Sequence, residues 1–106
     1  MQPEEVKQKI RKLMGEQIEF EGHFERVIEN IDENLQQHLL DWIRKCNNRE
    51  LLPFTAPIDR ELLVFFFKPN VTNIRGILKK RKNSYFIALF LDKHKYYDQE
   101  RKQLGF

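Results

Sequence analysis

The second half of the sequence contains side chains that together can act on a phosphodiester bond. Arg75 lies on a predicted strand, where its side chain points to the opposite face from Ile74 and Leu78. Residues 92–97, Asp-Lys-His-Lys-Tyr-Tyr, add an imidazole, two ammonium groups and two phenols. Cleavage of RNA through its 2′-hydroxyl needs a proton acceptor, a proton donor and positive charge beside the phosphate. The candidate catalytic residues are therefore Arg75, His94, Tyr96 and Tyr97.

Each of these four residues also has an ordinary structural role open to it. Arg75 can form a structural ion pair, and His94 can be a surface histidine without function. Tyr96 and Tyr97 can pack the last helix onto the domain. Both sets of roles stay open at the level of the sequence.

Positive charge is concentrated in the same half of the chain. Residues 1–53 carry eight Lys and Arg against eleven Asp and Glu, whereas residues 54–106 carry eleven against five. A field of this sign suits phosphate groups, so we predict a nucleic-acid partner. The candidate RNA-binding residues are Lys68, Lys79, Lys80, Arg81, Lys82, Lys93 and Lys95. The alternative is a solvated hairpin whose tip happens to be rich in lysine.

Several other kinds of chemistry lack the residues they need. The sequence has no phosphate-binding glycine loop, no dinucleotide-binding G-x-G-x-x-G, no H-E-x-x-H and no G-x-S-x-G. Cys46 is the single cysteine, and the three histidines lack metal-binding spacing, so we expect neither a metal nor a cofactor. We expect Cys46 to be a small buried hydrophobic residue. We assign no function to His23 or His38.

The chain is expected to be one cytoplasmic domain with no membrane association. Its 106 residues suit a single hydrophobic core. Uninterrupted apolar runs such as residues 62–67 are far shorter than the roughly 18 residues that a membrane-spanning helix needs. The sequence does not open with a charged stretch followed by an apolar one, so we expect no export signal.

The first half of the chain is predicted to be mainly helical. Pro3 and the following glutamates open a helix, and apolar residues recur at helical spacing behind them. Asp32 can cap a later helix that carries Leu39 and Trp42 on its apolar stripe. The predicted elements are helix 3–14, a short strand 17–20, and a helical hairpin over 22–30 and 33–47.

The second half of the chain is predicted to form mainly strands. Residues 51–59 contain two prolines and are expected to be an irregular connection. Residues 65–67 are three phenylalanines that we assign to core packing in an inner strand covered on both faces. The predicted elements are strand 62–68, an antiparallel hairpin of strands 74–80 and 85–91, and a closing helix 99–104. The fold class is α+β, a small antiparallel-rich sheet with its helices packed on one face.

The amino-terminal helix has a narrow apolar stripe and a charged outer face. Such a helix can dock on its own domain or on a second copy of the chain, where it would make a homodimer. We favour docking on its own domain.

The middle and last parts of the chain resemble a family of small toxins, the RelE/ParE-like superfamily and in particular its HigB/RelE branch. Residues 17–24, QIEFEGHF, are similar to the family's first strand as it enters the helical hairpin, and residues 32–47 stand for the second helix. Residues 61–67 resemble a strand that often reads L-x-E-L-R. Residues 73–78, NIRGIL, resemble the following Y-R-V-x-Y strand, and residues 85–95 resemble the last strand with its basic F-x-K-K ending.

The resemblance covers about residues 17–100, so residues 1–15 are an addition to the family pattern. Within residues 17–100 the sequence also departs from the family pattern at two places. Ile74 stands where an aromatic residue is usual, and residues 64–67 lack the expected strand arginine.

The resemblance implies the toxin of a type II toxin–antitoxin system. Such toxins are typically endoribonucleases that cut mRNA in the ribosomal A site and are held inactive by a cognate antitoxin; members of the ParE branch inhibit DNA gyrase instead. By the resemblance, Arg75 matches the strand arginine at the scissile phosphate, and His94, Tyr96 or Tyr97 match positions for proton transfer or base stacking. Lys68, Lys93 and Lys95 match basic groups that steady the phosphate.

Two alternatives come from other classes of protein. The same fold can serve as a non-catalytic, basic module that binds nucleic acid or another protein. The chain can also be an unrelated α+β interaction domain.

Overall fold

Residues 1–70 and 73–106, the part of the chain that the computed structural model describes, form four helices and five strands. Their order is α1 (Pro3–Met14), β1 (Ile18–Glu21), α2 (Phe24–Glu29), α3 (Glu33–Asn47), β2 (Phe54–Ala56), β3 (Asp59–Phe67), β4 (Ile74–Arg81), β5 (Ser84–Leu91) and α4 (His94–Gln103).

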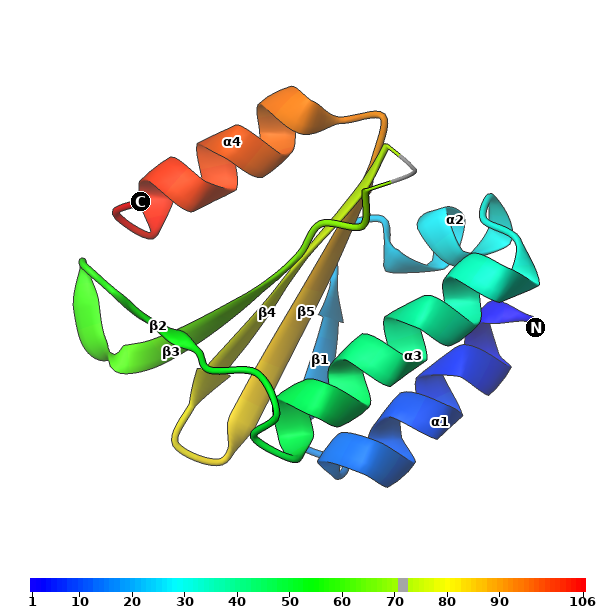
Figure 1. The fold of residues 1–106 in the computed structure, drawn as a ribbon, viewed down its shortest axis with the longest axis horizontal. Coiled ribbons are helices and arrows are strands. Elements are labelled where there is room, and N and C mark those ends of the chain that lie inside the picture. Colours follow the sequence, from blue (N-terminus) through cyan, green and yellow to red (C-terminus); the bar gives the residue numbers. More distant parts are fainter. Residues whose placement is uncertain (71–72) are drawn as a thin grey trace.

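The strands form one mixed sheet in the order β1-β5-β4-β3-β2 (Figure 1). β1 runs parallel to β5, with Ile18 opposite Tyr85 and Glu21 opposite Ala88. The other neighbours are antiparallel, and the predicted hairpin of β4 and β5 is confirmed. The connection from β1 to the rest of the sheet therefore contains the whole helical hairpin.

One strand was not predicted. β2 has only three residues, and it pairs with β3 within the segment 51–59 that we expected to be irregular. Pro53 and Pro57 flank it and limit it to a short edge strand, because proline cannot donate a ladder hydrogen bond. The sheet thus has five strands, one more than the sequence pattern indicated.

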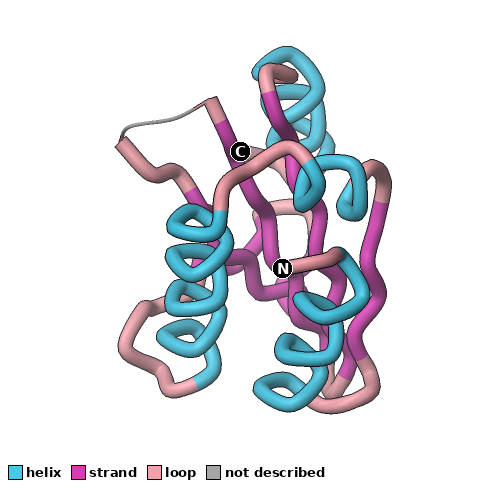
Figure 2. Tube along the Cα trace, turned by 90° about the vertical axis from the view of Figure 1, so that its right-hand side faces the viewer, coloured by secondary structure: helices cyan, strands magenta, loops and turns pink. Residues whose placement is uncertain are grey.

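The helices cover both faces of the sheet, which differs from the prediction that they share one face. α1, α2 and α3 lie on one face, whereas α4 lies on the other (Figures 1 and 2). The reason is that β3 and β4 are apolar on both sides: Phe65 and Leu78 face the three helices, while Val64 and Ile77 face α4. The prediction that residues 62–68 form an inner strand covered on both faces is confirmed.

The larger core lies under α1, α2 and α3. Val6 and Ile10 of α1 are fully buried, so the apolar stripe of this helix docks on its own domain, as favoured from the sequence. Trp42 of α3 is 7% exposed and packs on Phe67, with 5.1 Å between the ring centroids. Gln36, the buried polar residue of this layer, donates to the carbonyl oxygen of Ile28 at 3.1 Å.

Local signals place the helix ends. Pro3 occupies the first turn of α1, and the carboxylate of Asp32 accepts a hydrogen bond from the Leu35 N–H at 2.8 Å at the start of α3. Cys46 is buried on α3, and burial raises the pKa of its thiol to about 12. The prediction that Cys46 is a buried hydrophobic residue is confirmed.

The last helix starts earlier than predicted. Asp92 takes a left-handed backbone conformation, with φ of 56°, which ends β5 and turns the chain toward the other face of the sheet. α4 then begins at His94, five residues before the predicted start at residue 99. His94, Tyr96 and Tyr97 consequently lie in the first turns of a helix.

Candidate nucleic-acid interface

Arg75 lies on β4 and faces the α4 side of the sheet. Its neighbours Ile74 and Leu78 belong to the opposite core, as the alternation of side chains predicted. The side chain is half-buried, and its Nη1 donates to the carbonyl oxygen of Ile74 at 2.7 Å. The guanidinium is therefore held close to the strand from which it projects.

Tyr97 of α4 faces the same side of the sheet as Arg75. Its ring is 4% exposed and lies edge-on to Phe66 and Phe90, at centroid distances of 6.4 and 5.8 Å. Burial raises the pKa of the Tyr97 phenol, while the charges of Arg101 and Arg75 act in the opposite direction. Phe90, against which Tyr97 packs, is the β5 residue opposite Arg75, so Tyr97 lies over the same part of the sheet as Arg75.

The first turn of α4 presents the other candidate residues to solvent. Lys93, His94, Lys95 and Tyr96 are all exposed. The Lys93 ammonium lies 6.0 Å from the centroid of the Tyr96 ring. The sequence predicted these residues together with Tyr97, but the structure separates them: Tyr97 packs into the domain and the other four face outward.

Four of the predicted basic residues come together at one end of the sheet. Lys68 directly follows the last pair of the β3–β4 ladder, Phe67 with Gly76, and Arg75 directly precedes it on β4. Lys93 and Lys95 follow the end of β5, the next strand. We call this set, Lys68, Arg75, Lys93 and Lys95 with His94, the basic end of the sheet.

The remaining predicted basic residues lie elsewhere. Lys80, Arg81 and Lys82 are at the β4–β5 turn, five to seven residues from Arg75 along the chain and so about 20 Å from the basic end. Arg81 forms ion pairs there with Asp59 and Glu61, at 3.3 and 3.6 Å. The seven predicted RNA-binding residues therefore do not form one continuous surface.

Lys79 connects the sheet to α4. Its Nζ lies 3.0 Å from a carboxylate oxygen of Glu21 on β1 and 3.3 Å from one of Glu100 on α4. Burial lowers the pKa of the Lys79 ammonium, but its interactions with Glu21 and Glu100 outweigh this effect, so the pKa is raised. Lys79 is thus occupied by two carboxylates and serves as a structural cation.

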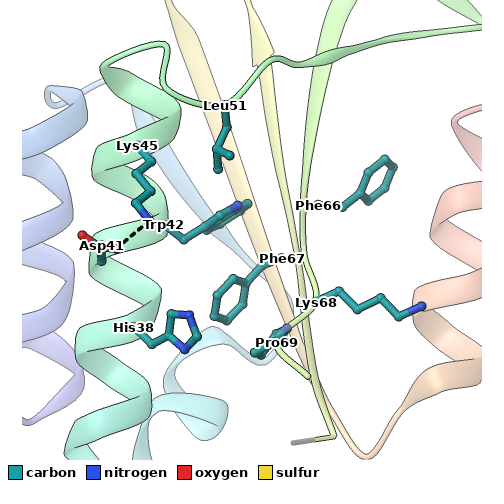
Figure 3. Close-up of a pocket in the computed structure, with 9 residues that line it drawn as sticks. All are labelled: His38, Asp41, Trp42, Lys45, Leu51, Phe66, Phe67, Lys68 and Pro69. Carbon is teal, nitrogen blue, oxygen red and sulfur yellow. Dashed lines mark ion pairs between the residues drawn. The ribbon is translucent and has the colours of Figure 1, made fainter. Parts of the chain in front are cut away.

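A small cavity of about 260 Å³ lies between α3 and the end of β3 (Figure 3). Trp42 and Phe67 lie side by side in it, and the His38 ring meets Phe67 edge-on at 5.7 Å. Figure 3 shows Phe66 and Lys68 pointing the other way, toward α4. Trp42 and Phe67 are therefore part of the core, and Phe66 packs against the core under α4, as predicted for residues 65–67.

A larger groove of about 520 Å³ lies between α2 and α4. It brings His23 and Arg26 from the first helical layer close to Lys93 and Tyr96 from α4. The sequence pattern indicated no function for His23 or Arg26. His23 and Arg26 lie near α4 because β1 pairs in parallel with β5. No local sequence pattern indicates this pairing.

Within residues 1–70 and 73–106, no group of three or more His, Cys, Asp or Glu residues could hold a metal ion. None of the helices described is long and apolar enough to cross a membrane. Comparison of the chain with protein-family models, curated proteins and solved structures finds no match.

Proposed function

We propose that the protein is a RelE-like toxin that cuts mRNA bound to the ribosome in the cytoplasm and is held inactive by a cognate antitoxin. The observation that carries the proposal is the basic end of the sheet. There Lys68, Arg75, Lys93 and Lys95 gather beside an exposed imidazole, His94. They supply the positive charge and one proton-transfer group of those that RNA cleavage without a metal requires.

The proposed reaction is attack of a ribose 2′-oxygen on the adjacent phosphorus. The 2′-hydroxyl proton passes to a base, the 5′-oxygen leaves with a proton from an acid, and a 2′,3′-cyclic phosphate remains. Arg75 would stabilise the crowded phosphate, and His94 would move a proton. The exposed Tyr96 ring offers a surface on which a base can stack.

Tyr97 has a different place in this proposal. Its phenol is buried and its pKa is raised, so it is a poor proton acceptor at neutral pH. Its position against Phe66 and Phe90 suits it to hold α4 over Arg75.

The fold is compatible with the proposal without being specific to it. A strand leads into a helical hairpin, and the chain then returns through antiparallel strands to a basic terminal helix. The same order supports the second candidate, a non-catalytic basic module. Two observations favour the non-catalytic module. Tyr97 is buried, and Lys79 is paired with two carboxylates, so fewer groups are left for catalysis.

Growth on induced expression tests the proposal. The parent chain is expected to arrest growth, and Arg75→Ala and His94→Gln are expected to relieve the arrest while the variants stay folded by circular dichroism. Removing one stabilising donor from a comparable site costs about 10²- to 10³-fold in rate. Arg60→Ala, which removes an exposed arginine from the far part of β3, is the matched control and should still arrest growth.

Two further variants separate the roles of the tyrosines. Tyr96→Phe and Tyr97→Phe keep the rings and remove only the hydroxyl groups. Relief of arrest by either one would assign proton transfer to that phenol. If the parent itself arrests nothing, the toxin proposal gives way to the non-catalytic module.

A further inference from the structure

The groove between α2 and α4 is a second feature of the surface near the start of α4. It exists because β1 is shorter than β5. β1 ends at Glu21, opposite Ala88, whereas β5 continues to Leu91. Gly22 then turns the chain out of the sheet with φ of 61° and into α2. The last residues of β5 are left as the floor of a groove between α2 and the start of α4.

The groove is lined by both basic and acidic side chains. His23, Arg26 and Lys93 contribute cationic or basic side chains. Glu21 and Glu100 also line the groove, and both form ion pairs with Lys79. Because Lys79 offsets part of their charge, the groove can accept an anion near Arg26 and Lys93 despite the two carboxylates.

The uncharged part of the groove suits a flat apolar group. Val27, Leu89 and Phe90 form part of the lining, and Tyr96 is 57% exposed at its edge. A volume of about 520 Å³ is within the usual range for small-molecule sites. An exposed aromatic ring next to cationic side chains is the combination that single-stranded nucleic acids use for stacking and backbone contact.

We propose that this groove binds one unpaired nucleotide of an RNA strand that continues to the basic end of the sheet. The base lies on the apolar lining and stacks against Tyr96, and its phosphate contacts Arg26 and Lys93. Amino or hydroxyl groups of the nucleotide can donate to Glu21 and Glu100. Lys93 belongs to both places, and Tyr96 of the groove directly follows His94 and Lys95 of the basic end, so one path joins the two. This inference rests on the proposed action on RNA.

An acidic peptide is a weaker candidate for the same groove. Its carboxylates would meet Glu21 and Glu100, and it would leave the exposed Tyr96 ring without a stacking partner. A nucleotide uses the cationic, aromatic and carboxylate groups together. The choice between them is an outcome of the following test.

Fluorescence anisotropy with a fluorescein-labelled oligoadenylate, at several salt concentrations, measures the contribution of the groove. Tyr96→Leu is expected to raise Kd about tenfold through loss of stacking. Arg26→Ala is expected to raise Kd and to reduce the log–log salt slope by about 0.7, the value for one phosphate contact on a single strand. Arg60→Ala removes the same charge outside the groove and should change neither quantity.

Amide chemical shifts locate the bound nucleotide directly. Titration of the ¹⁵N-labelled protein with adenosine 5′-monophosphate should move the signals of Gly22, Val27 and Leu89. The signals of Lys82 and Asn83 at the β4–β5 turn should stay in place. Shifts confined to that turn would overturn the inference, as would binding of a poly-glutamate peptide with higher affinity than oligoadenylate.

The two proposals fail in different ways. If the parent binds oligoadenylate through the groove but cuts no ribosome-bound mRNA, the toxin proposal fails and the groove stands. If the parent cuts mRNA while Arg26→Ala and Tyr96→Leu leave Kd unchanged, the groove proposal alone is wrong. If the parent binds no oligoadenylate, the groove proposal is wrong whatever the cleavage assay shows.

Discussion

Lys79 of β4 and Glu100 of α4 form an ion pair, with 3.3 Å between Nζ and Oε1, that ties the terminal helix to the sheet. Glu21 of β1 binds the same ammonium from the other side at 3.0 Å. The helix itself is polar, and Tyr97 is the buried residue within its bounds. Besides the packing of Tyr97 and Leu104 on the sheet, this ion pair therefore helps to set the position of α4.

Glu100→Gln should loosen α4 without unfolding the domain. The substitution keeps the shape of the side chain and removes its charge, and for a half-buried pair the expected loss is about 1 kcal/mol of unfolding free energy. Urea unfolding measures this loss, and faster hydrogen exchange of the α4 amides locates it. Glu29→Gln, at an exposed position of α2, is the control. Equal exchange rates in the parent and Glu100→Gln would show that the ion pair does not hold the helix.

Trp42→Ala should be strongly destabilising. Trp42 is 7% exposed and packs on Phe67, so truncation leaves a cavity between α3 and the sheet. The expected loss is about 3–5 kcal/mol in unfolding free energy, measured by urea titration. Trp42→Phe should cost clearly less, because an aromatic ring remains in contact with Phe67. A loss below about 1 kcal/mol for Trp42→Ala would contradict the observed packing.

Deletion of residues 1–15 should lower the melting temperature and leave the oligomeric state unchanged. Val6 and Ile10 are fully buried in the chain's own core, so the deletion exposes the surface of α2 and α3 that they cover. Differential scanning fluorimetry and sedimentation give the two readouts. Conversion of a dimer to a monomer would show that α1 also serves an interface between chains.

Cys46 should be unreactive in the folded protein. Burial raises the pKa of its thiol to about 12 from the ordinary 9.0, so almost no thiolate is present at neutral pH. Since the folded state disfavours ionisation, the Cys46 contribution to stability is present below pH 9.0 and declines as the pH rises toward 12. Iodoacetamide should modify the thiol in urea but not in buffer. Rapid modification of the native protein at neutral pH would contradict its burial.

The elements that local chemistry specifies were predictable from the sequence. Pro3 and Asp32 mark the starts of α1 and α3, and the apolar stripes of both helices have the spacing of a buried face. The turn at Lys82 and Asn83 separates two strand segments of equal length, so the β4–β5 hairpin follows. The alternation of Ile74 and Arg75 also gave the correct face for Arg75.

What depends on distant pairing was not predictable. β2 is three residues between prolines and is stabilised by its partner β3, not by its own pattern. α4 has little apolar surface of its own, so its sequence does not show which face of the sheet it covers. The proximity of His23 and Arg26 to Tyr96 results from β1 pairing in parallel with β5, whose residues are more than sixty positions away.

Primer extension on mRNA in stalled ribosomes is the most direct test of the proposed toxin activity. The purified parent chain is expected to cut the message within the codon in the A site, and Arg75→Ala is expected to cut it at least 100-fold more slowly. Arg60→Ala should cut like the parent. Intact message after incubation with the folded parent, or equal cutting by the parent and Arg75→Ala, would contradict the proposed function.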